Sequence, residues 1–362
     1  MVAKILLPEN VEAKVRVKSE DDNLIWFETY DSDFTVEFSV KKPPVATPRN
    51  YTFYFFYKNE IADTETFQIR INNESVGWCI PVSALDNSKH KFSELPFYKN
   101  FAISAFKHLI TDDENSISPL LGADKELGIS SFYEKDVVIL AISNSAKNFE
   151  LDKYIPFLFS LGFFAYKKEY APYNELLTRI PPEQKYIELN PVNADFDGNA
   201  FVVNMFKNVL IRKIDSLAAF LLNYQIYEQM IHISFERKLN DFKSSVASFA
   251  GTSSDLKDTL KDINKINDEL TKLKDYISTL DFPESALHYC GKKFYSVHCD
   301  ERKEHFAESL YCARNKILHN YRNLSSEAIK AIDMMNLELF ELTPKLICST
   351  VRQSVMDESA ST

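Results

Sequence analysis

The sequence predicts an α+β protein in which a β-rich and mixed α/β region precedes an all-helical bundle. Apolar residues alternate with polar ones at a period of two between residues 23 and 82. From Ala200 onwards they instead recur at three- and four-residue spacings, as on one face of a helix. A stretch rich in turn-forming residues, 191–199, separates the two patterns and predicts a domain boundary near residue 198.

Three regions and a short tail follow from these patterns, and a chain of 362 residues is long enough for two or three domains. The expected regions are a β-rich segment over 1–95, a mixed α/β segment over 96–198, a helical domain over 199–350 and a flexible tail over 353–362. The first two segments either form separate domains or belong to one.

Antiparallel strands are expected in the first segment. The alternation is clearest from Phe34 to Val40, and further strands are expected over 51–57, 67–71 and 77–82. Asn72 and Asn73 are among the turn-type residues between these runs. The segment is rich in aromatic side chains, which either fill the core of a small sheet or stack on RNA bases. They are Trp26, Phe27, Phe53, Phe55, Phe56 and Trp78.

The mixed segment is expected to contain two helices and a buried strand. The helices are predicted over Asn100–Leu109 and Leu151–Leu161, and the wholly apolar run Val137–Ile142 predicts the strand. In the helical domain, Ser253 or Ser254 is placed to cap a charged helical insertion near 255–280. Its apolar stripe is typical of either a helix in a bundle or a dimer-forming coiled coil.

Composition excludes several classes of protein. A hydrophobic content of 45% argues against disorder, and the seven glycines form no phosphate-binding loop of the dinucleotide-binding or P-loop type. No run reaches the roughly 20 apolar residues that span a membrane, and the first residues do not resemble a signal peptide. Five cysteines suggest no disulfide framework, so we expect a cytoplasmic protein that does not contact the membrane.

The net charge of −10 is unevenly distributed along the chain. Nearly all of it lies in residues 1–198, which leaves 199–362 almost neutral. A polyanion such as RNA can therefore approach the helical domain if its cations are clustered.

The segment Glu301–Arg322 predicts an amphipathic helix that carries candidate functional residues. On a helical wheel, one face is apolar and comprises Phe306, Leu310, Ala313, Ile317 and Tyr321. The other face is polar and titratable and comprises Glu308, Tyr311, Asn315, His319 and Arg322, with Arg314 at its edge and Lys316 nearby. Imidazole and guanidinium groups can deprotonate a 2′-hydroxyl, protonate a leaving oxygen and stabilise a phosphorane.

The run Arg314-Asn315-Lys316-Ile317-Leu318-His319-Asn320-Tyr321 resembles the motif of the HEPN superfamily, in which Arg precedes His by four to six residues. The resemblance implies an all-helical bundle that forms a homodimer through the helical domain, with two such helices facing each other in one ribonuclease cleft. It assigns the catalytic roles to Arg314 and His319 and a supporting role to Asn315. Lys316 and Arg322 are expected to help bind RNA.

The resemblance also implies metal-independent cleavage of RNA, such as tRNA or mRNA, without a cofactor and with 2′,3′-cyclic phosphate ends. In a subgroup of HEPN toxins the motif tyrosine is nucleotidylated, which makes Tyr321 a possible regulatory site beside its alternative role in packing. The family's habits suggest a conditional toxin or an anti-phage defence effector, in which the N-terminal region senses a phage trigger or binds a regulatory partner.

Two alternatives remain at this point. The helical bundle can be a non-catalytic, dimerising scaffold or binding protein of HEPN-like fold. Two His and two Cys within twelve residues, His288, Cys290, His298 and Cys299, can also suggest zinc, but their spacing is unlike that of structural zinc sites.

Overall fold

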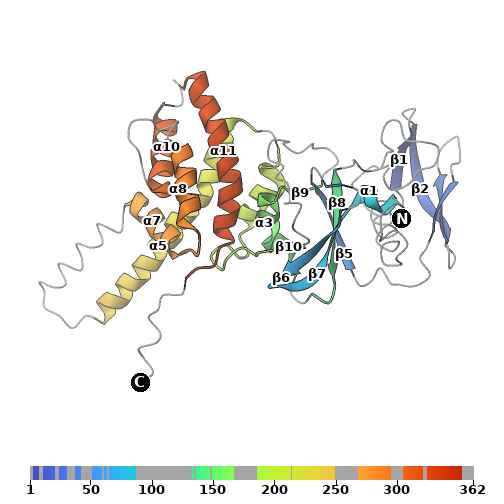
Figure 1. Ribbon diagram of the computed structural model, residues 1–362, viewed down its shortest axis with the longest axis horizontal. Helices are drawn as coiled ribbons and strands as arrows, with labels where there is room; N and C mark the ends of the chain where they lie inside the picture. Colours follow the sequence, from blue (N-terminus) through green and yellow to red (C-terminus); the bar gives the residue numbers. More distant parts are fainter. Residues whose placement is uncertain are drawn as a thin grey trace, which may run out of the picture. The chain divides into compact units, whose positions relative to one another are not determined.

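The computed structural model confirms the α+β class, with the described strands before residue 189 and the long helices after residue 215 (Figure 1). The structure describes residues 3–7, 11–20, 24–30, 37–41, 51–58, 61–62, 65–86, 133, 136–146, 149–166, 186–212, 214–248, 268–294, 305–320 and 324–352. The chain forms two compact units. The first comprises residues 1–150 and 161–189, and the second comprises residues 151–160 and 190–362.

The first sheet is an antiparallel meander of four strands that are neighbours both in sequence and in space. Its strands are β1 (Ala3–Leu7), β2 (Val11–Glu20), β3 (Leu24–Tyr30) and β4 (Glu37–Lys41). The strand β4 covers the second half of the alternating run that predicted a strand from Phe34 to Val40. The start of that run lies outside the described residues.

The second sheet has six strands in the order β10-β6-β7-β8-β5-β9. They are β5 (Tyr51–Tyr57), β6 (Phe67–Ile71), β7 (Glu74–Pro81), β8 (Val137–Ser143), β9 (Phe164–Ala165) and β10 (Tyr186–Glu188). The apolar strand β8 lies between β7 and β5, and its side chains are buried up to Ile142. A strand flanked on both sides can be apolar throughout when both of its faces are covered.

The boundary expected at residue 95 does not divide this sheet. Strands from the predicted β-rich segment pair directly with strands from the mixed segment, as β5 and β7 do with β8. The first segment and most of the mixed segment therefore belong to one unit, which also contains the short helix α1 (Val82–Asp86). The helix expected over Asn100–Leu109 lies outside the described residues.

Two local features of the second sheet follow directly from residue type. Asn72 and Asn73 have φ angles of 51° and 64° in the tight turn between β6 and β7. Asparagine tolerates this left-handed conformation, which two-residue hairpins require. The aromatic residues Phe53 and Trp78 pack against a buried cluster that contains Ile80 and Ala141, which supports a role in the core.

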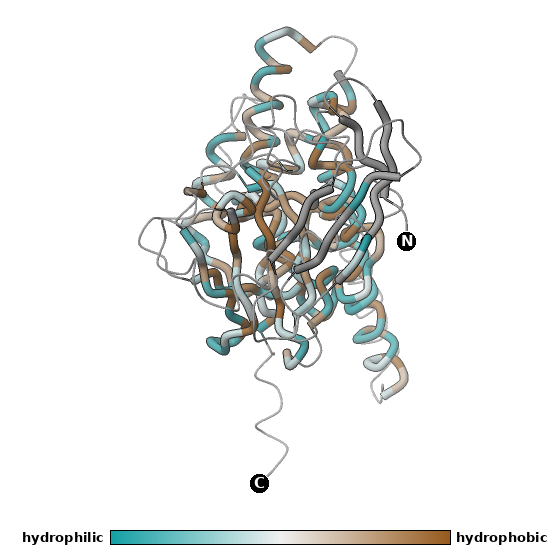
Figure 2. The backbone as a smooth tube through the Cα atoms, turned by 90° about the vertical axis from the view of Figure 1, so that its right-hand side faces the viewer, coloured by the Kyte–Doolittle hydropathy of each residue, from teal (hydrophilic) through white to brown (hydrophobic). Residues whose placement is uncertain are grey.

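The second unit is a helical bundle, in which hydrophilic and hydrophobic residues alternate along the turns of the helices (Figure 2). Its long helices are α5 (Ser216–Ala247), α7 (Glu269–Thr279), α8 (Glu284–Lys293), α10 (Phe306–Asn320) and α11 (Ser326–Ile347). Shorter elements are η3 (Leu151–Lys153), α3 (Ile155–Ser160), α4 (Ala200–Asn204) and the π-helix η5 (Met205–Val209). Helix α5 packs against α7 and α11, and α10 packs against α8 and α7.

The helical unit begins earlier than the boundary expected near residue 198. The backbone N–H of Val192 donates to Lys153 at 2.9 Å, and that of Asn193 donates to Ile347 at 2.8 Å. Phe159, from the helix predicted over Leu151–Leu161, has its ring centroid 6.1 Å from that of Phe340. Hydrogen bonds and ring contacts between segments distant in sequence thus add residues 151–160 and 190–198 to the helical unit. The local composition of these segments does not reveal that they belong to it.

The turn-rich stretch also joins two helices of the bundle. Asp195 accepts hydrogen bonds from Arg237 of α5, at 2.5 and 2.7 Å, and from the hydroxyl of Tyr276 of α7, at 2.8 Å. The two groups of donors hold α5 and α7 at a fixed distance from this loop. The stretch is therefore part of the packing of the bundle as well as a connection.

The charged helix expected near 255–280 is present in its second half. Asp268 caps α7 by accepting from the backbone N–H of Thr271, and residues 249–267 lie outside the described residues. Leu273 and Ile277 are buried within the same chain, which supports the bundle interpretation over the dimeric coiled coil. None of the described helices combines the length and apolarity needed to cross a membrane. The predicted tail over 353–362 lies outside the described residues.

Candidate functional site

The helix α10 has the two faces that the sequence predicts. Phe306, Leu310, Ala313 and Ile317 are at most 1% exposed and form its apolar face, while Tyr321 lies outside the described residues. On the polar side, Glu308 forms an ion pair with Lys274 of α7. Burial of the apolar face therefore fixes which side chains of α10 are presented towards the surface and towards α5.

Arg314 is directed towards α5 and makes three contacts, two of them with residues of α5. Its Nη2 lies 3.8 Å from Oε1 of Glu228, and its Nη1 donates to Oδ1 of Asn315 at 2.9 Å. The guanidinium carbon lies 5.5 Å from the ring centroid of Tyr224, in cation–π range. The side chain retains 24% exposure, so Arg314 is fixed in orientation but still reachable from solvent.

Two polar atoms at this contact have no hydrogen-bond partner among the described residues. They are Nε of Arg314 and the hydroxyl of Tyr224, and both are buried. An unsatisfied buried polar group costs about 1–3 kcal/mol. Polar groups kept at such a cost are common where a site serves function rather than stability.

Burial also dominates the electrostatics of Tyr224. It raises the pKa of the phenol well above its ordinary value, and the positive charge of Arg314 offsets only part of that increase. Tyr224 therefore stays protonated at neutral pH and presents a neutral ring to the guanidinium. The ring provides a flat support that limits the movement of Arg314.

His319 lies in a different environment from Arg314. Its side chain is exposed near the end of α10, and Lys316 is partly exposed one turn earlier. Five residues along a helix correspond to a rotation of roughly 140° and a rise of roughly 7.5 Å. Arg314 and His319 are therefore not brought together within one chain, whereas Asn315 and His319 lie on the same side of the helix. Arg322 lies outside the described residues.

A groove of about 330 Å³ lies between α5 and α7, next to Arg314. Its lining residues are Tyr224, Glu228, Ile231, His232, Phe235, Glu269 and Lys272. Two of these, Tyr224 and Glu228, are the contacts of Arg314 from α5. The Nζ of Lys272 lies 5.0 Å from the ring centroid of Phe235, which fixes a second cation in the groove.

The sequence pattern does not reveal this groove. Nothing in the spacing of His232 and Lys272 marks them, because they come from two helices whose alignment depends on tertiary packing. The signal that was available is the amphipathic pattern of each helix, which predicts a buried face but not its partner. Arg314 is thus the member of the motif that connects α10 to a concave surface.

The zinc alternative gains no support from the described part of the chain, where no group of three or more His, Cys, Asp or Glu is arranged to hold a metal ion. Cys290 is buried, and burial raises the pKa of its thiol well above the ordinary value. His298 and Cys299 lie outside the described residues.

Comparison with protein-family models, with curated proteins and with solved structures gave no match, so the residues and their geometry carry the functional argument.

Proposed function

We propose that the helical unit is a HEPN-like, metal-independent endoribonuclease. The observation that carries the proposal is the arrangement of α10, which holds Arg314 at the edge of a groove while His319 is exposed on the same helix. Guanidinium groups stabilise phosphorane charge, and an exposed imidazole can transfer protons near neutral pH.

The proposed reaction is an internal transesterification of RNA. One imidazole takes the proton from the 2′-hydroxyl, the 2′-oxygen attacks phosphorus, the bond from phosphorus to the 5′-oxygen breaks, and the imidazolium returns the proton to that oxygen. The guanidinium stabilises the charge that develops on the non-bridging oxygens. The products are a 2′,3′-cyclic phosphate and a 5′-hydroxyl, and no metal or cofactor takes part.

The separation of Arg314 and His319 around α10 supports a site built from two chains. When two copies of α10 face each other, Arg314 of one chain and His319 of the other can act on the same phosphodiester. In this arrangement Asn315 orients Arg314, and Lys316 and Arg322 neutralise neighbouring phosphates. The helical unit then forms a homodimer whose assembly completes the cleft.

The biological role proposed is that of a conditional toxin or anti-phage defence effector in the cytoplasm. The first unit then serves as the region that senses a trigger or binds a regulatory partner. Its negative charge, which accounts for most of the charge of the chain, keeps RNA away from it and leaves the almost neutral helical unit as the RNA-binding part.

One observation favours a second candidate, a non-catalytic dimerising scaffold. Both terminal nitrogens of Arg314 already have partners, namely Glu228 and Asn315. An arginine held in this way can serve to fix α10 against α5 without binding phosphate. The two candidates differ in whether Arg314 and His319 are needed for anything beyond folding and dimerisation.

Cleavage of RNA in EDTA by the purified full chain tests the proposal, with Arg314→Ala, His319→Ala and Lys330→Ala as variants. Lys330→Ala is the matched control because it removes an exposed cation from α11. We expect cyclic phosphate ends from the wild type and from Lys330→Ala only. Equal cleavage by all four proteins would contradict the assignment, and folded, dimeric but inactive wild type would favour the scaffold.

A mixing experiment tests whether the two residues act across a dimer. Arg314→Ala and His319→Ala chains are unfolded together, refolded and compared with each chain alone. If each Arg–His pair in the dimer joins residues of different chains, the mixture regains about a quarter of wild-type activity, because half of the dimers are mixed and each of these keeps one of the two pairs. No recovery would show that the residues act within one chain.

A further inference from the structure

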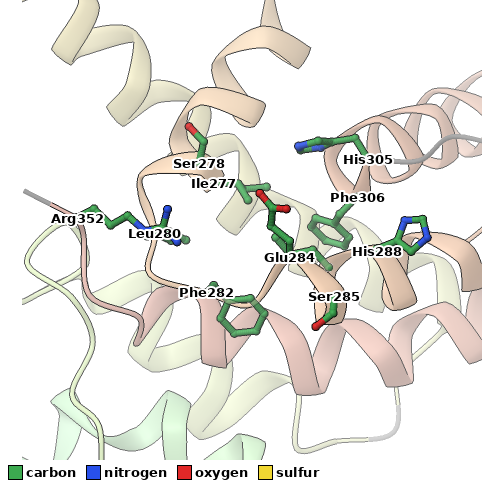
Figure 3. A pocket seen from close by; sticks show the side chains of 11 residues that line it. Ile277, Ser278, Leu280, Phe282, Glu284, Ser285, His288, His305, Phe306 and Arg352 are labelled. Carbon is green, nitrogen blue, oxygen red and sulfur yellow. The ribbon is translucent and has the colours of Figure 1, made fainter. Parts of the chain in front are cut away.

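A second cavity, of about 530 Å³, lies at the opposite end of α10 from His319 (Figure 3). It is enclosed by the end of α7, the start of α8, the first residues of α10 and the C-terminal segment. Its volume lies within the range of small-molecule sites in proteins. Its lining residues are Ile277, Ser278, Leu280, Phe282, Glu284, Ser285, Leu287, His288, His305, Phe306 and Arg352.

The backbone fixes the part of the wall that comes from the C-terminal segment. Leu280 and Val351 form an antiparallel bridge, and the N–H of Arg352 donates to the carbonyl of Thr279 at 2.7 Å. The Arg352 side chain is 60% exposed and lies 3.6 Å from Asp281, which is 70% exposed. Such an exposed ion pair contributes little, so an anionic ligand can replace Asp281 as its partner.

His305 presents a hydrogen-bond donor to the cavity. Its Nδ1 accepts from the backbone N–H of Ala307 at 3.3 Å, which assigns the proton of the neutral ring to Nε2. Partial burial, together with the charge of Lys274, lowers the pKa of His305 and favours this neutral form at pH 7. In Figure 3 the imidazole projects from the start of α10 towards the side of the cavity that carries Ser278.

Acceptors and an apolar wall complete the cavity. The carboxylate of Glu284 lies among Ile277, Phe282 and Phe306 in Figure 3, and its negative charge opposes the lowering of the pKa of His305. The Oγ of Ser278 donates to the carbonyl of Asp275 at 2.7 Å, which leaves its lone pairs as acceptors.

The ligand that fits must combine an aromatic or apolar body with two kinds of polar edge. A carboxylate favours a ligand with adjacent N–H donors, and the Nε2–H of His305 favours an acceptor beside them. Guanine carries these groups in this order along one edge, with the exocyclic amino group and N1–H as donors and O6 as the acceptor. Adenine lacks both the N1–H donor and the O6 acceptor.

We propose that this cavity is a binding site for a guanine nucleotide. The base lies against Phe282, Glu284 accepts from the N1–H and the amino group, and His305 donates to O6. Arg352, which Figure 3 shows on the other side of Glu284 from the histidines, pairs with the phosphate.

The site is separate from the proposed ribonuclease groove. His305 precedes Arg314 by nine residues, which corresponds to roughly 13.5 Å along the helix. The proposal therefore does not depend on RNA cleavage, and it adds a small-molecule site to the same helix. A bound nucleotide bridges α8, α10 and the C-terminal segment and so stabilises the bundle near the start of α10.

Calorimetric titration of the full chain with guanosine 5′-monophosphate, adenosine 5′-monophosphate and inorganic phosphate tests the proposal. We expect the guanine nucleotide to bind at least about tenfold more tightly than the adenine nucleotide, because guanine offers Glu284 two adjacent N–H donors where adenine offers only its amino group. Inorganic phosphate alone is expected to bind much more weakly, because it lacks the base.

Two variants assign the binding to this cavity. Glu284→Gln keeps the shape of the side chain but replaces one acceptor by a donor, and is expected to weaken guanine nucleotide binding by roughly tenfold or more. Arg352→Ala is expected to weaken the binding of guanosine 5′-monophosphate but not the binding of guanosine, which has no phosphate. Glu236→Gln, at an exposed position of α5, is the matched control and is expected to bind as the wild type does.

Thermal melting and circular dichroism of each variant establish that the fold is intact. The proposal is overturned if neither nucleotide binds, if both bind equally, or if Glu284→Gln and Glu236→Gln bind alike. Saturation-transfer signals from the base protons that disappear in Glu284→Gln would support it independently of the heat of binding.

Discussion

The two histidines at the ends of α10 have different environments. His305 precedes the helix, accepts a backbone hydrogen bond and lines a cavity formed by α7, α8 and the C-terminal segment. His319, near the other end, lines neither of the two cavities described above. Burial along α10 follows its faces rather than its ends, because Phe306 and Ile317 are both buried while His305 and His319 are both exposed. The polar face near His319 is left accessible to a second chain or to RNA, and the four predictions below test this division between the polar and the buried face.

The largest effect is expected from His319. His319→Ala should lower the rate of RNA cleavage by about 10²–10⁴-fold, the usual contribution of a general acid or base. The free energy of unfolding should change by less than about 0.5 kcal/mol, because the side chain is exposed. Single-turnover cleavage and urea denaturation measure the two quantities. A large loss of stability in His319→Ala would show that the His319 side chain is buried in the folded protein.

Neighbouring residues should separate the two faces of α10. Ile317→Ala is expected to lower the free energy of unfolding by about 2–5 kcal/mol, because Ile317 is fully buried and its truncation leaves a cavity. Leu318→Ala, at a position 39% exposed, is the matched control and should cost far less. Denaturation with urea gives both values. Similar losses in the two variants would contradict the assigned faces.

Glu228 tests whether Arg314 is available to RNA. Glu228→Gln removes the carboxylate beside the guanidinium, and is expected to tighten RNA binding up to about fivefold, the equivalent of about 1 kcal/mol for an exposed ion pair. Glu236→Gln removes a charge from the same helix and serves as the control for a general electrostatic effect. Filter binding at low salt measures the change. Equal effects of the two variants would favour the scaffold interpretation of Arg314.

The smallest effect concerns the pH dependence of stability through His305. Its pKa in the folded protein lies below the ordinary value of 6.5, so the unfolded chain binds a proton more readily. The stability associated with the neutral imidazole is therefore present above pH 6.5 and is lost as the pH falls from there through the folded pKa.

Melting temperatures at about pH 7.5 and about pH 5.5 test this sign for the wild type and His305→Gln. We expect the variant to lose less stability between the two pH values than the wild type loses. Lys330→Ala, remote from His305 in the sequence, should follow the wild type. If the stability of His305→Gln depended on pH as strongly as that of the wild type, the pKa of His305 would be the same in the folded and the unfolded protein.

Local patterns predicted several elements correctly. The strands Tyr51–Tyr57 and Phe67–Ile71 have the predicted bounds, and Asn72 and Asn73 form the turn after the second of them. These features depend on alternation and on left-handed backbone angles, which are properties of a few consecutive residues. The same is true of the apolar face of α10.

The sequence by itself thus determined the α+β class, four of the six strands of the second sheet, the amphipathic helix and the residue types of the motif. Tertiary structure alone decided that residues 151–160 join the helical unit, that Arg314 contacts Tyr224 and Glu228, and that His305, Glu284 and Arg352 line one cavity. The physical reason is that periodicity defines which face of an element is buried, but not which distant element covers it. That choice depends on the packing of the whole bundle.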